Sequence, residues 1–430
     1  MKRKTAAILL GMIVSASMIV GCGNKEATEA ASQGEQTGGE EEAEEEAKAE
    51  KEEKAAEEKE EEEEEGSSEG EETPEEEPKT VAVLLPDDSD ECWSQDGENI
   101  RSELELAGYE PKILYADGDG EEQSSQVVEM VEEGVDAFLI APADAYALTD
   151  ALAQAKENDI PVFSYDELIM DSDAVSYYVT FNSREIGQAL GNSIIEQMEL
   201  EKAKEESRSY NIEFFMGSPD DLKSLFLYNG VMEVLQPYLD DGTLVCQSQR
   251  TSFNDTALMR FSESGAERNL SEILEEAYQG KTLDIICTSF DGAVSGVIEA
   301  LDQVGISPDG EQWPMITGVG CELPAVQRIA EGSQTNSVYM DRETLAKEGV
   351  KMVDTYLKGE DPEVTDYEQY DNGKKIIGTY TCEIQLIDKD NYELLIDKGY
   401  YTEEEVLPDG AVAEEEEEAE ISATPTPDPE

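Results

Sequence analysis

The chain has 430 residues, no histidine and a formal net charge of −74 at pH 7. The missing histidine removes the commonest general base and the commonest metal ligand, which argues against most hydrolytic enzymes. Such an acidic surface repels phosphate backbones, so nucleic acid is excluded as a partner.

Residues 1–22 have the layout of a cleavable export signal. Three basic residues, 2–4, precede an apolar stretch from Ala6 to Val20 that is too short for a typical membrane span. The segment ends in Gly21-Cys22, which resembles the lipobox of bacterial lipoproteins, whose cysteine becomes the acylated first residue. This resemblance implies a lipid anchor at Cys22 and a location on the outer face of the bacterial cytoplasmic membrane. The alternative is an ordinary secretory signal with an unrelated cysteine.

Two acidic segments flank the body of the chain. Residues 23–78 are predicted to form a disordered tether, because 23 Glu and 4 Lys between residues 40 and 78 leave too little apolar surface to fold. Residues 407–430 are predicted to be a disordered tail for the same reason. We expect both segments to lie outside the folded part.

The body alternates short apolar runs with helical patterns, which is typical of parallel sheets covered by helices. A first α/β unit is predicted from strands at 81–85, 112–115, 137–140, 161–165 and 175–181, with helices at 93–107, 123–133 and near 146–158. A second unit begins with a helix at Ser183 and continues through strands at 212–216, 243–246, 283–287, 315–319 and 337–340. The sequence therefore predicts two α/β lobes.

Ligands of open α/β sheets bind beyond the carboxyl ends of the strands, so the turns that follow the strands are the candidate site. These turns are 86–93, 165–170, 217–223, 289–292, 318–322 and 340–342. Several hold carboxylates and aromatic rings, which suit a ligand rich in hydroxyl groups. No Gly-x-Gly-x-x-Gly follows a strand, and the run 117–120 lacks the further ligands of a calcium loop, so no cofactor or metal is expected.

Several motifs resemble the bacterial multiple-sugar-binding periplasmic proteins of the xylose, galactose and glucose type. The resemblance is collinear from about Thr80 to about Val406 and rests on the strings YDELI at 165–169, VSYYVTF at 175–181, GSPDD at 217–221, FDG at 290–292, DPEV at 361–364, YDNG at 370–373 and GYY at 399–401.

This resemblance implies a type I periplasmic binding protein fold, with two doubly wound parallel-sheet lobes joined by a three-segment hinge. The first lobe would contain residues 79–181 plus 341–376, and the second 182–340 plus 377–406. The crossings would lie near Phe181, Met340 and Ile377. Closure of the lobes on a ligand would occur by hinge bending.

Four ligand-binding residues follow from the resemblance. Asp166 occupies the place of a hydroxyl-binding Asp, Asp291 matches a second one, and Trp93 and Phe261 stand where the family has aromatic rings. Taken alone, these aromatic residues fit a core role equally well, and Asp166 fits a helix cap or a turn.

Three further positions depart from the family pattern. Glu167 replaces an Arg, Lys223 replaces an Asn, and Met340 replaces a Lys. An unpaired carboxylate in a desolvated cleft is costly, so Glu167 would favour a cationic or amino-sugar-like ligand unless Lys223 or Arg342 pairs with it. A neutral aldopentose or aldohexose is the expected ligand, and the cationic ligand is the alternative.

The resemblance thus implies a monomeric, non-enzymatic solute-binding protein that delivers a sugar to the membrane permease of an ABC importer. A ligand-binding sensor subunit is an alternative with the same fold. An enzyme is disfavoured because Asp166 and Glu167 are adjacent, whereas a catalytic carboxylate pair must flank the scissile bond.

Overall fold

The computed structural model describes residues 78–89 and 91–407. The predicted signal segment with Cys22, the tether up to residue 77 and the tail from residue 408 lie outside the described residues. The strands are β1 (Thr80–Leu85), β2 (Glu110–Tyr115), β3 (Ala137–Ile140), β4 (Val162–Tyr165), β5 (Val175–Phe181), β6 (Tyr210–Phe215), β7 (Leu244–Val245), β8 (Ile285–Thr288), β9 (Met315–Ile316), β10 (Asn336–Met340), β11 (Gly378–Cys382) and β12 (Ile384–Asp388).

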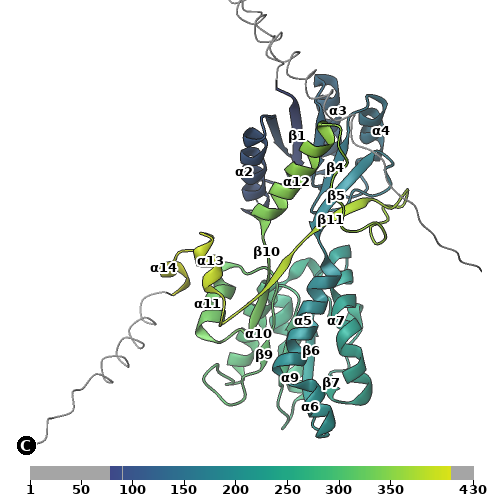
Figure 1. Cartoon of the computed structure of the whole chain (residues 1–430). Coiled ribbons are helices and arrows are strands. Elements are labelled where there is room, and N and C mark those ends of the chain that lie inside the picture. The colour runs from purple at the N-terminus through teal and green to yellow at the C-terminus, as the bar shows by residue number, and fades with distance from the viewer. Residues whose placement is uncertain (1–77, 90, 408–430) are drawn as a thin grey trace, which may run out of the picture. The chain divides into compact units, whose positions relative to one another are not determined.

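Helices connect most of these strands, as Figure 1 shows. They are α2 (Glu91–Leu106), α3 (Gly120–Glu133), α4 (Thr149–Glu157), α5 (Ser183–Gln197), α6 (Leu200–Glu205), α7 (Leu222–Asp241), α8 (Phe253–Thr256), α9 (Glu263–Ala277), α10 (Asp291–Gln303), α11 (Leu323–Glu331), α12 (Arg342–Leu357), α13 (Glu393–Asp397) and α14 (Glu403–Val406), with a 3-10 turn at Met259–Phe261. Within the described part of the chain, no helix combines the length and apolar character that a membrane span needs.

Strands β1 to β5, together with the late strand β11, form a six-stranded sheet in the order β11-β5-β4-β3-β1-β2. All of its strand pairings are parallel. The side chains of β1 alternate between its two faces. Val81, Val83 and Leu85 share a hydrophobic cluster with α2 and α12, whereas Ala82 and Leu84 share another with α3 and α4. Because both faces are covered by helices, β1 is a continuous apolar run.

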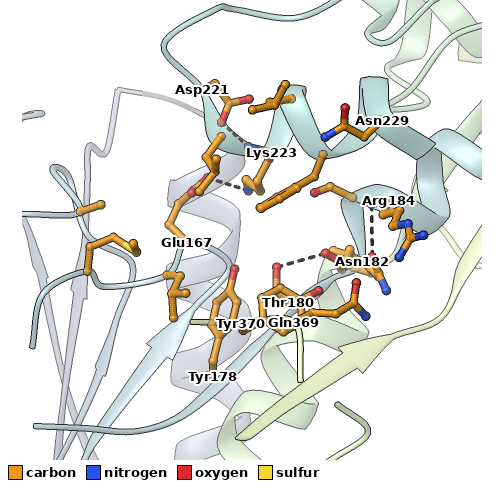
Figure 2. A pocket seen from close by; sticks show the side chains of 18 of the residues that line it. Glu167, Tyr178, Thr180, Asn182, Arg184, Asp221, Lys223, Asn229, Gln369 and Tyr370 are labelled. Carbon is orange, nitrogen blue, oxygen red and sulfur yellow. Dashed lines mark hydrogen bonds and ion pairs between the residues drawn. The ribbon is translucent and has the colours of Figure 1, made fainter. Parts of the chain in front are cut away.

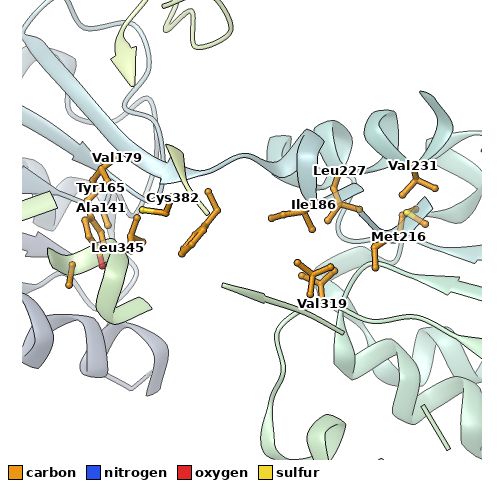
Figure 3. Close-up of a cluster of buried hydrophobic side chains, with 14 of the residues drawn as sticks. Ala141, Tyr165, Val179, Ile186, Met216, Leu227, Val231, Val319, Leu345 and Cys382 are labelled. Carbon is orange, nitrogen blue, oxygen red and sulfur yellow. The ribbon is translucent and has the colours of Figure 1, made fainter. Parts of the chain in front are cut away.

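A four-stranded parallel sheet in the order β7-β6-β8-β9 forms the centre of the second half. One face packs on α5 and α7, the other on α9 and α10. Figure 3 shows labelled residues of one cluster in two groups, with Tyr165, Val179 and Leu345 near the first sheet and Met216 and Leu227 near the second. The predicted α/β fold with parallel sheets is confirmed.

The chain passes between the two sheets at three places. β5 of the first sheet is followed by α5, whose N-cap is Asn182, and β10 is followed by α12, whose N-cap is Asp341. The third passage lies at Glu383, between β11 and β12. The prediction of a crossing near Ile377 is wrong by one strand, because residues 378–382 pair in parallel with β5 before the chain leaves that sheet.

β10 and β12 form a separate antiparallel pair, in which Met340 lies opposite Ile384. The strand predicted at 315–319 is shorter than expected: β9 ends at Ile316, and Val319 makes only an isolated bridge to Val338. Gly318 explains part of this difference, because a Cβ there would lie 2.1 Å from the carboxylate of Asp291. The backbone therefore approaches a buried side chain at this point and leaves the regular ladder.

Candidate functional site

The candidate site begins where β4 ends. Asp166 follows directly and has a positive φ of 57°, a conformation that is uncommon for residues other than glycine and is held by surrounding contacts. Its N–H donates to the carbonyl of Val179 at 2.9 Å, while the hydroxyls of Tyr178 and Thr180 donate to its own carbonyl at 2.5 and 2.9 Å. These contacts to the backbone of Asp166 hold its left-handed conformation in place.

Five charged side chains form an alternating chain around Asp166. Arg342, the first residue of α12, donates to the Asp96 carboxylate on α2 at 2.9 Å and to the Asp166 carboxylate at 3.3 Å. The ammonium group of Lys223, near the start of α7, lies 3.3 Å from the other oxygen of Asp166 and 2.6 Å from the Glu167 carboxylate. The order is therefore Asp96, Arg342, Asp166, Lys223, Glu167, with every cation between two carboxylates.

This arrangement keeps the central charges fixed. Burial opposes the charged form of Asp166, but Lys223 and Arg342 outweigh it and hold the pKa of that carboxyl below its ordinary value. Burial also disfavours the charged forms of Lys223 and Arg342, yet the carboxylates beside them raise the pKa of both. For the outer carboxyls Asp96 and Glu167, burial dominates and raises the pKa.

Trp93 lies beside this chain of charges. It is half-buried on α2, and the guanidinium carbon of Arg342 lies 5.2 Å from the centre of its ring. A cation over an aromatic face is attracted by the ring and also loses freedom to turn away. The structure therefore brings together four of the seven predicted ligand-binding residues: Trp93, Asp166, Glu167 and Lys223.

The other three make their contacts elsewhere. Phe261 is exposed, has a positive φ of 51°, and packs edge-on against Phe290 with ring centres 5.4 Å apart. Asp291 is buried, and its carboxylate accepts hydrogen bonds from Gln334 at 2.9 Å and from Ser337 at 2.9 Å. Protein donors thus already occupy both oxygens of Asp291, and burial raises its pKa.

Met340 is half-buried in β10 and packs against the hydrophobic cluster that contains Cys382. Its backbone belongs to the strand pair that connects the two sheets. In this structure Met340 is part of a connection between elements, and its thioether can offer a ligand apolar contact and a weak hydrogen-bond acceptor but no donor.

Asp96 belongs to the site but was not among the predicted residues. It is fully buried and is the partner that fixes Arg342. A signal was present in the sequence: Trp93, Asp96, Ile100 and Leu104 recur at the spacing of one helix face, so an acid at the second position lies on the apolar face. A carboxylate placed there requires a cationic partner.

A groove of about 890 Å³ adjoins the chain of charges. Glu167 and Lys223 line the groove and also belong to the chain of charges. The other predicted ligand-binding residues do not line the groove. Figure 2 shows Lys223 and Asn229 on α7 at the top of the view, Glu167 on the left, and Arg184 and Asn182 on the right. The groove therefore borders the predicted site without containing its centre at Asp166.

Comparison with known proteins gives a consistent result. The family profile "Periplasmic binding protein domain" matches residues 81–361. The multiple sugar-binding periplasmic receptor ChvE of Rhizobium radiobacter is 36% identical over 323 residues, which cover 75% of this chain and 90% of that protein. The multiple sugar-binding periplasmic protein SbpA of Azospirillum brasilense is 35% identical, with the same coverage.

A solved structure shares the fold over the same region. It is an ABC transporter solute-binding protein of Clostridium phytofermentans with bound β-D-glucose, 40% identical to this chain, with a TM-score of 0.68. The match covers 76% of this chain and the whole of that protein.

Proposed function

Because the chain belongs to the periplasmic binding protein family, among its multiple sugar-binding members, we propose that it is the sugar-binding receptor of an ABC importer. The family consists of binding proteins and not of enzymes. The ligand we propose is a neutral monosaccharide, an aldopentose or aldohexose. Similarity to a protein with bound β-D-glucose supports a hexose.

The paired state of Glu167 is the observation that carries the choice of a neutral ligand. A lone carboxylate in this position would favour an amine, but the ammonium group of Lys223 lies 2.6 Å from it. The two cations, Lys223 and Arg342, are likewise already bound by carboxylates. A charged ligand would have to displace one of these ion pairs, whereas a hydroxyl group can add hydrogen bonds to them.

We assign the residues of the site by their chemistry. Asp166 accepts hydrogen bonds from sugar hydroxyls, and Arg342 and Lys223 donate to them. Trp93 covers one apolar face of the ring, and hinge closure would bring Phe261, which contacts Phe290 in this structure, to another. Asp291 acts in this proposal by holding the loop around Gly318, because its carboxylate is bound to the protein.

The proposal includes hinge closure and a lipid anchor. One lobe carries the six-stranded sheet and the other the four-stranded sheet, and the hinge consists of the passages at Asn182, Asp341 and Glu383. Asp166 follows a strand of the first sheet, while Lys223 lies in the first turn of the helix after β6 of the second, so closure brings the accepting carboxylate and the donating ammonium group to one ligand. Acylation at Cys22 would hold the receptor at the outer face of the membrane, beside its permease.

Thermal unfolding tests the ligand assignment. The full-length chain is unfolded and refolded to remove carried ligand, then heated with D-glucose, D-xylose, D-glucosamine or D-glucuronate. At 100 times its dissociation constant a ligand adds about 2.7 kcal/mol, which raises the midpoint by several degrees. We expect a rise with the neutral sugars and little with the charged ones. A rise with D-glucosamine alone would favour the cationic ligand. An unchanged midpoint with all four compounds would contradict sugar binding.

A second measurement tests the anchor. Cys22→Ala should move the protein from the membrane fraction to the soluble fraction of the producing bacterium, while Cys246→Ala should leave it membrane-bound. Equal membrane association of both variants would contradict acylation at Cys22.

A further inference from the structure

The groove beside Glu167 and Lys223 is lined by apolar, amide and charged side chains. Its volume of about 890 Å³ lies near the upper end of the range of small-molecule pockets. Three of its lining residues, Tyr146, Leu222 and Phe226, are large apolar side chains that expose 60%, 50% and 41% of their surface. Exposed apolar side chains gathered around one hollow point to a ligand that covers them.

The apolar residues face the hollow from different parts of the fold. Tyr146 lies between β3 and α4, next to the six-stranded sheet, whereas Leu222 and Phe226 lie on the first turns of α7. An aromatic ring on each side suits a flat, partly apolar body such as a sugar ring, because the C–H faces of pyranoses pack on aromatic rings. The amides of Asn229 and Gln369 and the hydroxyl of Tyr370 also line the groove, and Figure 2 shows them at its rim.

The charges of the groove disfavour an anionic occupant, because four carboxylates and two cations line it. Arg184 is bound by Glu233 at 2.8 Å, and Lys223 is bound by Glu167. Asp221 caps α7 by accepting hydrogen bonds from the N–H groups of Lys223 and Ser224. Both cations that line the groove are thus paired, so they offer no free partner to an anion.

We propose that the groove binds the second ring of a neutral disaccharide whose first ring lies at Asp166 and Arg342. The proposal rests on the proposed function, because the first ring occupies the monosaccharide site. Glu167 and Lys223 border both places, so a glycosidic link passing this ion pair would leave each ring in contact with aromatic and polar side chains. The receptor would therefore accept glucose disaccharides as well as free glucose.

Calorimetric titration of the full-length chain tests this proposal. The probes are D-glucose, maltose, cellobiose and melibiose, which differ in the linkage to the second ring. We expect at least one disaccharide to bind. Phe226→Ala should lower the affinity for that disaccharide about tenfold and change the affinity for D-glucose by less than about twofold, because only the second ring touches Phe226.

Two leucines supply a matched control. Leu222 and Leu106 are both exposed, but only Leu222 lines the groove. Leu222→Ala should lower the affinity for the disaccharide alone, and Leu106→Ala should change the affinity for neither ligand. Binding of D-glucose without any disaccharide, or equal loss of both ligands in Phe226→Ala, would overturn the second subsite and leave the proposed function intact. Absence of binding by all four probes would overturn both.

Discussion

The ammonium group of Lys223 lies 2.6 Å from the carboxylate of Glu167, and the two residues follow strands of different sheets. Lys223 also reaches Asp166 at 3.3 Å. The ion pair therefore links the halves of the molecule that the hinge is proposed to move. It also pairs Glu167 without any ligand, and this is the observation on which the proposal of a neutral ligand rests.

Lys223→Met should loosen this link, because Met keeps much of the side-chain volume but leaves Glu167 and Asp166 without a shared cation. We expect the ligand-free radius of gyration to increase and stability to fall by about 1–3 kcal/mol. Small-angle scattering and thermal unfolding measure the two effects. Lys204→Met is the matched control, because Lys204 pairs with Asp241 at the surface and should alter neither quantity. An unchanged radius in Lys223→Met would show that the ion pair does not restrain the lobes.

Arg342→Lys should destabilise the protein although it keeps the positive charge. Arg342 contacts Asp96, Asp166 and the ring of Trp93 through one planar group, and a lysine cannot reproduce this geometry. The fully buried Asp96 would lose part of its pairing, at a cost of about 1–3 kcal/mol.

Chemical denaturation measures this loss. Arg184→Lys provides the control, since Arg184 makes a similar two-pronged contact with Glu233 on the surface and the exchange should lower the free energy of unfolding by less than about 1 kcal/mol. Equal effects of the two exchanges would contradict a special role for Arg342.

Asp166→Asn should change the pH dependence of stability. The pKa of Asp166 is lowered in the folded state, so the unfolded chain binds more protons as the pH falls below about 4. The stabilising contribution of this carboxylate is therefore complete above that pH and is lost as the pH falls through the folded pKa. Urea unfolding from pH 3 to 7 measures the free energy of unfolding of wild type and variant. The difference between the two should be constant above pH 5 and should shrink below pH 4. A difference that grows on acidification would mean that the pKa of Asp166 is raised instead.

Phe261→Ala should weaken sugar binding with little loss of stability. The ring of Phe261 is 46% exposed and touches the protein mainly through Phe290 and the backbone near Gly217. Removing one stacking ring should reduce the affinity for D-glucose about tenfold, which corresponds to about 1.4 kcal/mol. Phe226→Ala gives the matched comparison and should leave D-glucose binding nearly unchanged. Titration calorimetry distinguishes the two, and an unchanged affinity in Phe261→Ala would remove this residue from the monosaccharide site.

Much of the fold was predictable because it depends on local patterns. The apolar run of β1 and the spacing of the following helix are visible in the sequence, and both appear within one or two residues of their expected bounds. The last crossing was misplaced because β11 is a short strand whose partner, β5, lies about 200 residues earlier in the chain. Pairing between such distant segments leaves no local pattern to detect.

The sequence by itself determined the α/β class with parallel sheets and the strongly acidic character of the chain, and it predicted the turns where a ligand would bind. These follow from composition and periodicity, which act along the chain. Only the tertiary structure decided that Lys223 pairs with Glu167, that Asp96 holds Arg342, and that protein donors already bind Asp291. The physical reason is that the charge state and availability of a buried group depend on the partners that folding brings within a few ångströms, and those partners come from remote parts of the chain.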